Sequence, residues 1–269
     1  ASDVYKRQEF MYTLYLDAFS GISGDMFIGA LLDLGLDFDV LQTELKKLNL
    51  SGYKLYYEKK AKNSVFGSDF DVILEDGKKD CGIEECHPHH NGRSFSDIKQ
   101  IIENSNLSTF IKTHSIDVFH EIAEAESIVH NKNIDEIHFH EVGAIDSIID
   151  IVGSFIGLEK LNITEIISSP LTDGCGHINI AHGEMPVPVP AVMQMRVNSS
   201  IPIHQRLDIN TELITPTGLG IIKNIVSNFS SIPDDMNILK IGYGFGKRDT
   251  GCFNALRMLL LKKNSIKIK

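Results

Sequence analysis

The stretch YTLYLDAFSGISGDMFIGALLDLG, residues 12–35, decides how the chain begins to fold. Residues 12–17 have the pattern of a short strand, and residues 19–25 are a turn rich in glycine and serine. The apolar residues 26–34 predict a helix, which Gly35 ends because glycine readily adopts the left-handed conformation of helix C-termini. The chain is therefore predicted to open with a strand, a tight turn and a helix in direct succession.

Outward from this segment, the periodicity of the sequence predicts a mixture of helices and strands. Further helices are expected at residues 37–48, 95–103, 107–130, 143–161 and 218–226. Further strands are expected at residues 53–59, 65–74, 237–243 and 254–261, with short strands and turns between residues 162 and 217. No internal repeat or linker is visible in the sequence, so we expect a single α+β unit in which helices pack on a mixed sheet.

The composition excludes several classes of protein. The chain has 269 residues, of which 42% are hydrophobic, enough to bury a sizeable core. Lys and Arg total 26 against 36 Asp and Glu, and the net charge of −10 argues against binding to nucleic acid. No stretch approaches the roughly 20 apolar residues of a membrane span. The four scattered cysteines do not suggest a disulfide scaffold, and we expect a cytoplasmic protein whose residues 1–10 are a leader outside the fold.

The stretch EDGKKDCGIEECHPHHNGRS, residues 75–94, interrupts the periodicity and is predicted to be a surface loop. It carries His87, His89 and His90, and this concentration of imidazoles suits a transition metal. The two cysteines of the loop are five residues apart, which matches no zinc-finger spacing. The histidine-rich loop is therefore interpreted either as a metal-capture segment or as an ordinary surface loop that happens to contain histidine.

A second group of metal-binding residue types lies between an extended segment and a helix. His138 and His140 are two residues apart in the extended segment, so their side chains lie on the same side. Glu141 follows directly, and Asp146 and Asp150 are one helical turn apart on the next helix. Imidazole and carboxylate groups suit Ni, Zn, Mn or Fe. The alternative is that the aspartates form a solvated helix face and the histidines only make hydrogen bonds.

Three segments are candidates for binding a phosphate or another anion. The first is the turn of residues 20–24, where glycines and the following helix N-terminus can present backbone N–H groups. The second is Thr217 with Gly218 at an expected helix start, and the third is the cationic pair Lys247 and Arg248. Simple helix capping and a solvated hairpin end are the alternatives for the last two.

Several motifs in a fixed order resemble the nickel insertion protein family of nickel-pincer cofactor biosynthesis. They are LYLDAFSGISGDMFIGALLDLG (14–35), the histidines at 87–90, HFHEVGAIDSIIDIVG (138–153), AHGEMPVPVPA (181–191), ELITPTGLG (212–220) and GYGFGKRD (242–249). The resemblance implies a nickel cyclometallase of the lyase type that inserts Ni²⁺ into pyridinium-3,5-bisthiocarboxylic acid mononucleotide. It also implies consumption of CTP with Mg²⁺ or Mn²⁺ and a place in the maturation of lactate racemase.

The resemblance bears on the organisation of the chain as well. Residues 11–269 resemble the N-terminal region of the family. The resemblance attributes CTP binding to a C-terminal domain of the family, and we expect these residues to lack that domain. We therefore expect nickel insertion to need a separate C-terminal polypeptide as a partner, and self-association of the chain is compatible with the resemblance.

Together, the resemblance and the residue chemistry predict three sets of site residues. Nickel is expected to be held by His138, His140 and Glu141, with His87, His89 and His90 as a loading site. Formation of a nickel–carbon bond requires loss of a ring proton, for which Asp17, Asp25 and Asp146 are the candidate bases. The substrate or its phosphate is expected to contact Ser20, Gly21, Ser23, Gly24, His182, Thr217, Gly218, Lys247 and Arg248.

Two other classes of function remain open at this point. A nickel-binding metallochaperone or storage module would need the histidine-rich loop but no catalytic carboxylate. A metal-dependent phosphate-ester enzyme would be built on Asp17 and Asp25.

Overall fold

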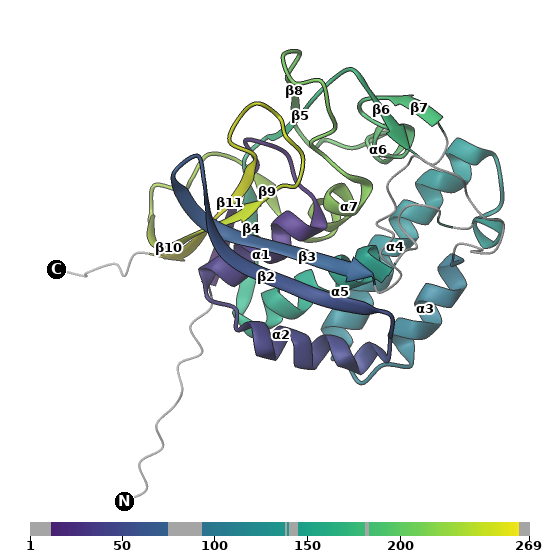
Figure 1. Ribbon diagram of the computed structural model, residues 1–269, viewed down its shortest axis with the longest axis horizontal. Helices are drawn as coiled ribbons and strands as arrows, with labels where there is room; N and C mark the ends of the chain where they lie inside the picture. Colours follow the sequence, from purple (N-terminus) through teal and green to yellow (C-terminus); the bar gives the residue numbers. More distant parts are fainter. Residues whose placement is uncertain (1–11, 75–92, 138, 140–144, 181–182, 264–269) are drawn as a thin grey trace, which may run out of the picture.

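A seven-stranded mixed sheet forms the centre of the protein in the computed structural model (Figure 1). The structure describes residues 12–263 apart from 75–92, 138, 140–144 and 181–182. In spatial order the strands are β2 (Tyr53–Lys62), β3 (Val65–Leu74), β10 (Met236–Phe245), β11 (Ala255–Lys263), β1 (Tyr12–Asp17), β4 (Ile163–Ser168) and β9 (Asn228–Phe229). β1 runs antiparallel to β11 and parallel to β4, so the first and last strands of the described chain are neighbours.

The helix α1 (Gly24–Leu34) lies on one face of this sheet and contacts β3, β10 and β11. Nearly all of its side chains are buried, as is usual for a helix that is apolar on every side. It approaches β10 very closely: a Cβ atom at Gly244 would lie 1.9 Å from the carbonyl oxygen of Met26, so only glycine fits there. A second buried helix, α5 (Ile145–Lys160), packs against α1.

The other helices and the short strands complete the fold around α1 and α5. The helices are α2 (Phe38–Leu45), α3 (Phe95–Glu103), α4 (Thr109–His130), α6 (Pro190–Met195) and α7 (Pro216–Ile225), with 3₁₀ turns η1 (Lys46–Leu48) and η2 (Ile134–Glu136). The short strands form a parallel pair, β5 (Leu171–Asp173) with β8 (Ile203–Gln205), and a hairpin, β6 (His177–Ile180) with β7 (Gly183–Pro186). α4 packs against α5, α6 and α7, and the short strands lie at the top of Figure 1.

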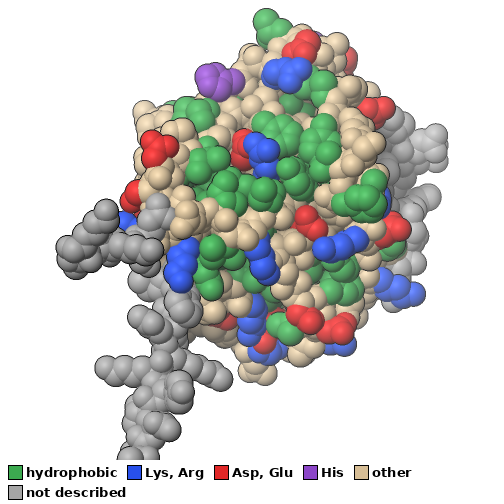
Figure 2. Space-filling model, turned by 90° about the vertical axis from the view of Figure 1, so that its left-hand side faces the viewer, with side chains coloured by type: hydrophobic (Ala, Val, Ile, Leu, Met, Phe, Trp, Pro, Cys, Tyr) green, Lys and Arg blue, Asp and Glu red, His purple; other side chains and the backbone are tan. Residues whose placement is uncertain are grey.

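The opposite face of the sheet carries a smaller apolar cluster. Tyr15 belongs to it, whereas Leu14 and Leu16, which point the other way from β1, belong to the main core. Its buried members are Tyr15, Ile167, Leu259 and Leu261. Figure 2 shows hydrophobic side chains gathered over this side of the molecule, with charged side chains between them. β10 contributes the exposed residues Ile238, Leu239 and Ile241 to the surface.

The structure confirms the α+β class and the strand, turn and helix that open the chain. α1 begins at Gly24, two residues before the expected start, and β2 continues to Lys62 beyond its expected end. α6 was not expected, because the prolines before it favour extended structure. Pro190 occupies its first turn, where the missing N–H group needs no partner. Within the described part of the chain, no helix is long and apolar enough to cross a bilayer.

Candidate active site

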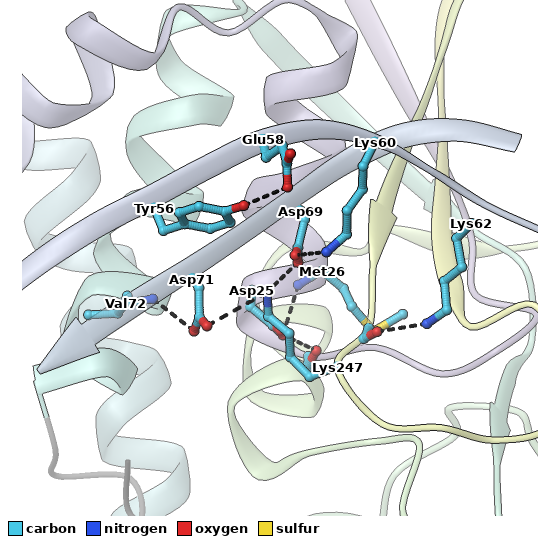
Figure 3. Close-up of polar contacts among 12 residues, drawn as sticks. Asp25, Met26, Tyr56, Glu58, Lys60, Lys62, Asp69, Asp71, Val72 and Lys247 are labelled. Atoms are coloured by element: carbon cyan, nitrogen blue, oxygen red, sulfur yellow. Dashed lines mark hydrogen bonds and ion pairs between the residues drawn. The ribbon is translucent and has the colours of Figure 1, made fainter. Parts of the chain in front are cut away.

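Carboxylates from three elements converge at the N-terminal end of α1. Asp25 is in the first turn of α1, Asp71 is on β3, and Asp146 and Asp150 are on α5. The other three aspartates act electrostatically on Asp150, as does Lys247 from the turn after β10. Figure 3 shows Asp25, Asp71 and Lys247 in the same region. We refer to Asp25, Asp71, Asp146 and Asp150 as the carboxylate cluster.

Direct contact between α1 and α5 closes one side of the carboxylate cluster. A Cβ atom at Gly24 would lie 2.5 Å from Cβ of Asp150 and 2.7 Å from its Oδ2 atom. Atoms in a packed interior do not approach this closely, so position 24 must be glycine for α5 to place Asp150 there. The glycine therefore brings a carboxyl group to the N-terminus of α1, where the helix dipole favours negative charge.

Asp150 has a strongly perturbed environment. Its Oδ1 atom is buried and has no hydrogen-bond partner among the described residues. Burial raises the pKa of Asp150 well above its usual value, and repulsion by Asp25, Asp146 and Asp71 raises it further, while attraction to Lys247 opposes the shift. The carboxyl group of Asp150 therefore holds a proton more readily than an exposed aspartate does.

Asp25 differs from Asp150 because it has hydrogen-bond donors. Its Oδ1 atom accepts from the Ser23 hydroxyl and, at 2.9 Å, from the backbone N–H of Met26. Burial raises the pKa of Asp25, and the donors Ser23 and Met26, together with Lys247, limit the shift. Ser23 is the N-cap residue of α1, yet its side chain makes no capping bond to the helix. The Ser23 hydroxyl therefore supports the cluster rather than the helix end.

Lys247, expected to receive a phosphate, is paired with carboxylates. It contacts Asp69 and lies 3.9 Å from Asp71, and Lys60 forms a second ion pair with Asp69 (Figure 3). Burial alone would raise the pKa of Asp69, but hydrogen bonds from Lys247 and Lys60 outweigh it and hold that pKa below its usual value. An incoming anion would compete with Asp69 for Lys247.

Two more predicted site residues are engaged in ion pairs. Arg248 donates to Glu212 at 2.7 Å. Asp17 accepts from Arg257 at 2.9 Å, across the β1–β11 register. Because Asp17 follows the fully buried Leu16, its side chain leaves the strand on the face opposite to α1. The structure therefore does not bring Asp17 together with the carboxylate cluster.

The turn of residues 20–24 lies beside the start of α7. The N–H group of Thr215 donates to the carbonyl of Ile22 at 3.1 Å, and a Cβ atom at Gly218 would lie 2.3 Å from that oxygen. Thr215 caps α7 by accepting from the N–H of Gly218 at 3.1 Å. The structure thus brings the turn together with Thr217 and Gly218, as a common anion site requires, although Thr217 is buried.

Asp173, at the end of β5, anchors the segment that leads into α7. Its Oδ1 atom accepts from the backbone N–H groups of Gly174 at 2.8 Å, Leu213 at 3.0 Å and Ile214 at 3.2 Å. Leu213 in turn accepts from the N–H of Ile22 at 2.9 Å. Burial raises the pKa of Asp173, and the three backbone donors oppose the shift. This fully buried carboxyl group therefore fixes the turn that precedes α1.

The predicted nickel-binding residues lie outside the described part of the chain. This holds for His87, His89, His90, His138, His140 and Glu141, and also for His182. Phe139, between the two predicted ligands, is buried, and its N–H group donates to the carbonyl of Arg93 at 3.1 Å. The described residues themselves contain no group of three or more His, Cys, Asp or Glu arranged to hold a metal ion.

Three acidic residues of this region were not expected from the sequence. Asp69 and Asp71 alternate with the buried Phe70, and such alternation was a detectable signal for two acids on one face of β3. The sequence around Asp69 and Asp71 did not indicate that this face of β3 would lie near α1 and the turn after β10. Asp173 had no signal in the sequence, because its donors Leu213 and Ile214 lie about forty residues further along the chain.

Comparison with known proteins places the chain in a family. A family model described as nickel insertion protein matches residues 14–269. The chain therefore belongs to the nickel insertion protein family. No solved structure was found to match it.

Two curated relatives carry a more specific name, pyridinium-3,5-bisthiocarboxylic acid mononucleotide nickel insertion protein. The protein from Lactiplantibacillus plantarum is 56% identical over 264 residues, which cover 95% of this chain and 63% of the relative. The protein from Acetivibrio thermocellus is 52% identical over 250 residues, covering 93% of this chain and 60% of the relative. The chain thus spans about three fifths of the length of these relatives.

Proposed function

We propose that the chain is the nickel-handling part of a cyclometallase that inserts Ni²⁺ into pyridinium-3,5-bisthiocarboxylic acid mononucleotide. The observation that carries this proposal is the carboxylate cluster, which lies in a chain 56% identical to a relative named for that substrate. Carboxyl groups gathered near Lys247 favour a negative potential at this corner, and this attracts a divalent cation. We expect the protein to work in the cytoplasm.

In this proposal the metal is the cargo and the histidines receive it. His138, His140 and Glu141 would hold Ni²⁺ beside the substrate, and His87, His89 and His90 would load it. Phe139 supports the placement, because its burial and its bond to Arg93 anchor the backbone between the two imidazoles a few residues before α5. Asp146, in the first turn of α5, would assist these ligands.

The substrate's phosphate would bind where α1 and α7 begin. Two helix N-termini next to each other favour an anion, and the side chains and N–H groups there belong to the expected phosphate-binding residues. Ser20, Gly21, Ser23 and Gly24 would act with Thr217 and Gly218, with His182 lining the site. Because Asp150 lies against Gly24, we place the phosphate toward the α7 side of the turn.

Use of CTP with Mg²⁺ or Mn²⁺ would be supplied by a C-terminal domain or partner polypeptide. Lys247 and Arg248, the cations expected from the sequence to bind a phosphate, each contact a carboxylate. The described residues therefore fit CTP poorly, and we derive no step through it. The lyase-type classification of the reaction belongs to the same proposal.

The competing functions receive different support. A phosphate-ester enzyme built on Asp17 and Asp25 is disfavoured, because Asp17 is paired with Arg257 on the opposite face of the sheet. A nickel chaperone or store without catalysis would need the histidine-rich loop but not the carboxylate cluster. The two remaining functions differ in whether substrate changes nickel uptake.

The deciding experiment is nickel titration of the chain with and without the substrate mononucleotide, followed by CTP and the partner polypeptide. Substrate-dependent uptake that ends in nickel-containing nucleotide supports insertion. A chain carrying both His138→Ala and His140→Ala should lose that uptake, whereas the exposed His204→Ala control should keep it. Nickel uptake that is indifferent to substrate would point to storage instead.

A further inference from the structure

Asp150 is the acid of this region that the fold leaves without a donor on a buried oxygen. Asp25 accepts two hydrogen bonds, Asp69 is paired with two lysines, and Asp71 lies near Lys247. The Oδ1 atom of Asp150 is buried and has no such partner within the described residues. A buried oxygen of this kind costs stability. Oδ2 of Asp173 shares this feature, but Asp150 differs from Asp173 because other carboxylates surround it, which favours an explanation in terms of function.

The position of Asp150 is fixed by helix packing. The neighbouring Ile148, Ile149 and Ile151 are fully buried, and Gly24 touches the Asp150 side chain from α1. The packing against Gly24 therefore restricts how far the carboxyl group can turn toward α1. An acceptor held in this way is ready for an incoming donor and needs no rearrangement to receive it.

The charges around Asp150 make it a good proton acceptor. Asp25 faces it from α1, Asp71 from β3 and Asp146 from its own helix, while Lys247 is the cation that faces it from the turn after β10. Burial and the three carboxylates raise the pKa of Asp150, and a raised pKa makes a carboxylate a stronger base. The acceptors expected from the sequence are less suitable, because Asp25 and Asp146 accept hydrogen bonds and Asp17 is paired with Arg257.

We propose that Oδ1 of Asp150 accepts the proton that leaves the substrate ring when nickel is inserted. This inference rests on the proposed function. The substrate named for the relatives carries thiocarboxylates at ring positions 3 and 5, so a nickel ion held by both sulfurs faces carbon 4 between them. The C–H bond at carbon 4 breaks, its electron pair forms the nickel–carbon bond, and the proton moves to Asp150. Nickel remains Ni²⁺, and no oxidant or reductant is needed.

The test compares Asp150→Asn and Asp150→Glu with Asp117→Asn, which alters an exposed aspartate on α4. Nickel incorporation into the substrate mononucleotide is measured by mass spectrometry with Ni²⁺, CTP and the partner polypeptide present. Asp150→Asn should lower the rate by about 10²- to 10⁴-fold, the usual contribution of a general base. Asp150→Glu should retain part of the rate with a displaced pH profile, and Asp117→Asn should match the unaltered chain.

Two further measurements separate a proton acceptor from a nickel ligand or a structural residue. Nickel affinity should change by less than about threefold in Asp150→Asn, because the residue does not hold the metal. The melting temperature should stay equal or rise, since a neutral amide relieves repulsion within the carboxylate cluster. A lost nickel affinity, a lowered melting temperature or an unchanged incorporation rate would each overturn the inference.

Failure of the proposed function would look different. In that case the unaltered chain would form no nickel-containing nucleotide under any of these conditions, whatever residue stands at position 150. The melting temperature would still decide the status of Asp150. A lower value in Asp150→Asn than in Asp117→Asn would make Asp150 a structural residue and overturn the inference, whereas an equal or higher value would support a functional role.

Discussion

Asp150 and Asp173 are both enclosed carboxyl groups whose pKa is raised by burial, but their surroundings are opposite. Oδ1 of Asp173 accepts three backbone hydrogen bonds from segments that it joins, although its Oδ2 atom is buried without a donor among the described residues. Asp150 faces other carboxylates, and its buried Oδ1 atom has no donor among the described residues. The two buried carboxyl groups thus have different roles. Asp173 stabilises the scaffold, whereas we infer that Asp150 makes the candidate site reactive at some cost in stability.

The largest effect is expected for Asp173→Ala. Three buried backbone N–H groups lose their acceptor, and the free energy of unfolding should fall by about 3–5 kcal/mol. Urea denaturation measures the change, with Asp150→Ala as the matched variant in the other environment. We expect a much smaller loss of unfolding free energy for Asp150→Ala. Equal losses in the two variants would contradict the difference between the two sites.

Gly24→Ala should have the next largest effect. The new Cβ atom would meet Asp150, and such overpacking costs about 1–3 kcal/mol. Repeating Gly24→Ala in a chain that carries Asp150→Gly removes the opposing Cβ atom. A double-mutant cycle by urea denaturation should then show that most of the cost depends on residue 150. A cost that is independent of residue 150 would mean that the close packing of α1 on α5 lies elsewhere.

Lys247→Ala should cost about 1 kcal/mol, because Asp69 and Asp71 lose a cation while Lys60 still serves Asp69. The pKa of Asp150 should rise further, since Lys247 is the cation that lowers it. Carboxyl ¹³C NMR titration reads that pKa directly. The control is Lys99→Ala, which removes an exposed ion pair with Glu103. It should leave the pKa of Asp150 unchanged and alter the free energy of unfolding by less than about 0.5 kcal/mol.

The smallest effect is expected from pH. A raised pKa means that the folded chain keeps its Asp150 proton at pH values where the unfolded chain has lost it, so this group lowers stability as pH rises above the usual aspartate range. Asp150→Asn removes that loss. The free energy of unfolding of Asp150→Asn should equal that of the unaltered chain near pH 3. Toward pH 7 it should become higher, by less than about 1 kcal/mol. Chemical denaturation across this range tests it, and a gain that is independent of pH would contradict the titration of Asp150.

Asp69 should respond to pH in the opposite sense. Its pKa is held below the usual value by Lys247 and Lys60, so its contribution to stability is present above the pKa of the unfolded chain and is lost as pH falls. Asp69→Asn should therefore destabilise the protein near pH 7 and have little effect near pH 2. Measured together, Asp69→Asn and Asp150→Asn should show opposite trends with pH.

Local sequence signals were sufficient for most of the fold. The strand pattern of residues 12–17 and the glycine that ends α1 are short-range features, and both predictions were confirmed. The unexpected α6 shows the limit of such signals, because proline favours both extended segments and the first turn of a helix. The choice at residues 190–195 depends on packing against α4 and α7.

The candidate site was only partly predictable, because it also depends on contacts between distant parts of the chain. Asp146 and the turn of residues 20–24 were expected from adjacent sequence. The arrival of Asp71 depends on β3, which is paired with β10 at Ser68 and Gly244, positions far apart in the chain. The placement of Asp150 depends on a glycine on another helix. Contacts of this range leave no trace in local periodicity, so the cluster became visible only in three dimensions.

The pairing of β1 with β11 has a consequence for synthesis of the protein. β1 is made first, but one of its two edges stays unpaired until residues 255–263 have left the ribosome. Lys247 and β10 also emerge after the four aspartates, so the carboxylate cluster lacks this cation until then. A nascent chain halted before residue 255 would expose the edge of an apolar strand, which is an aggregation hazard that chaperones would have to cover.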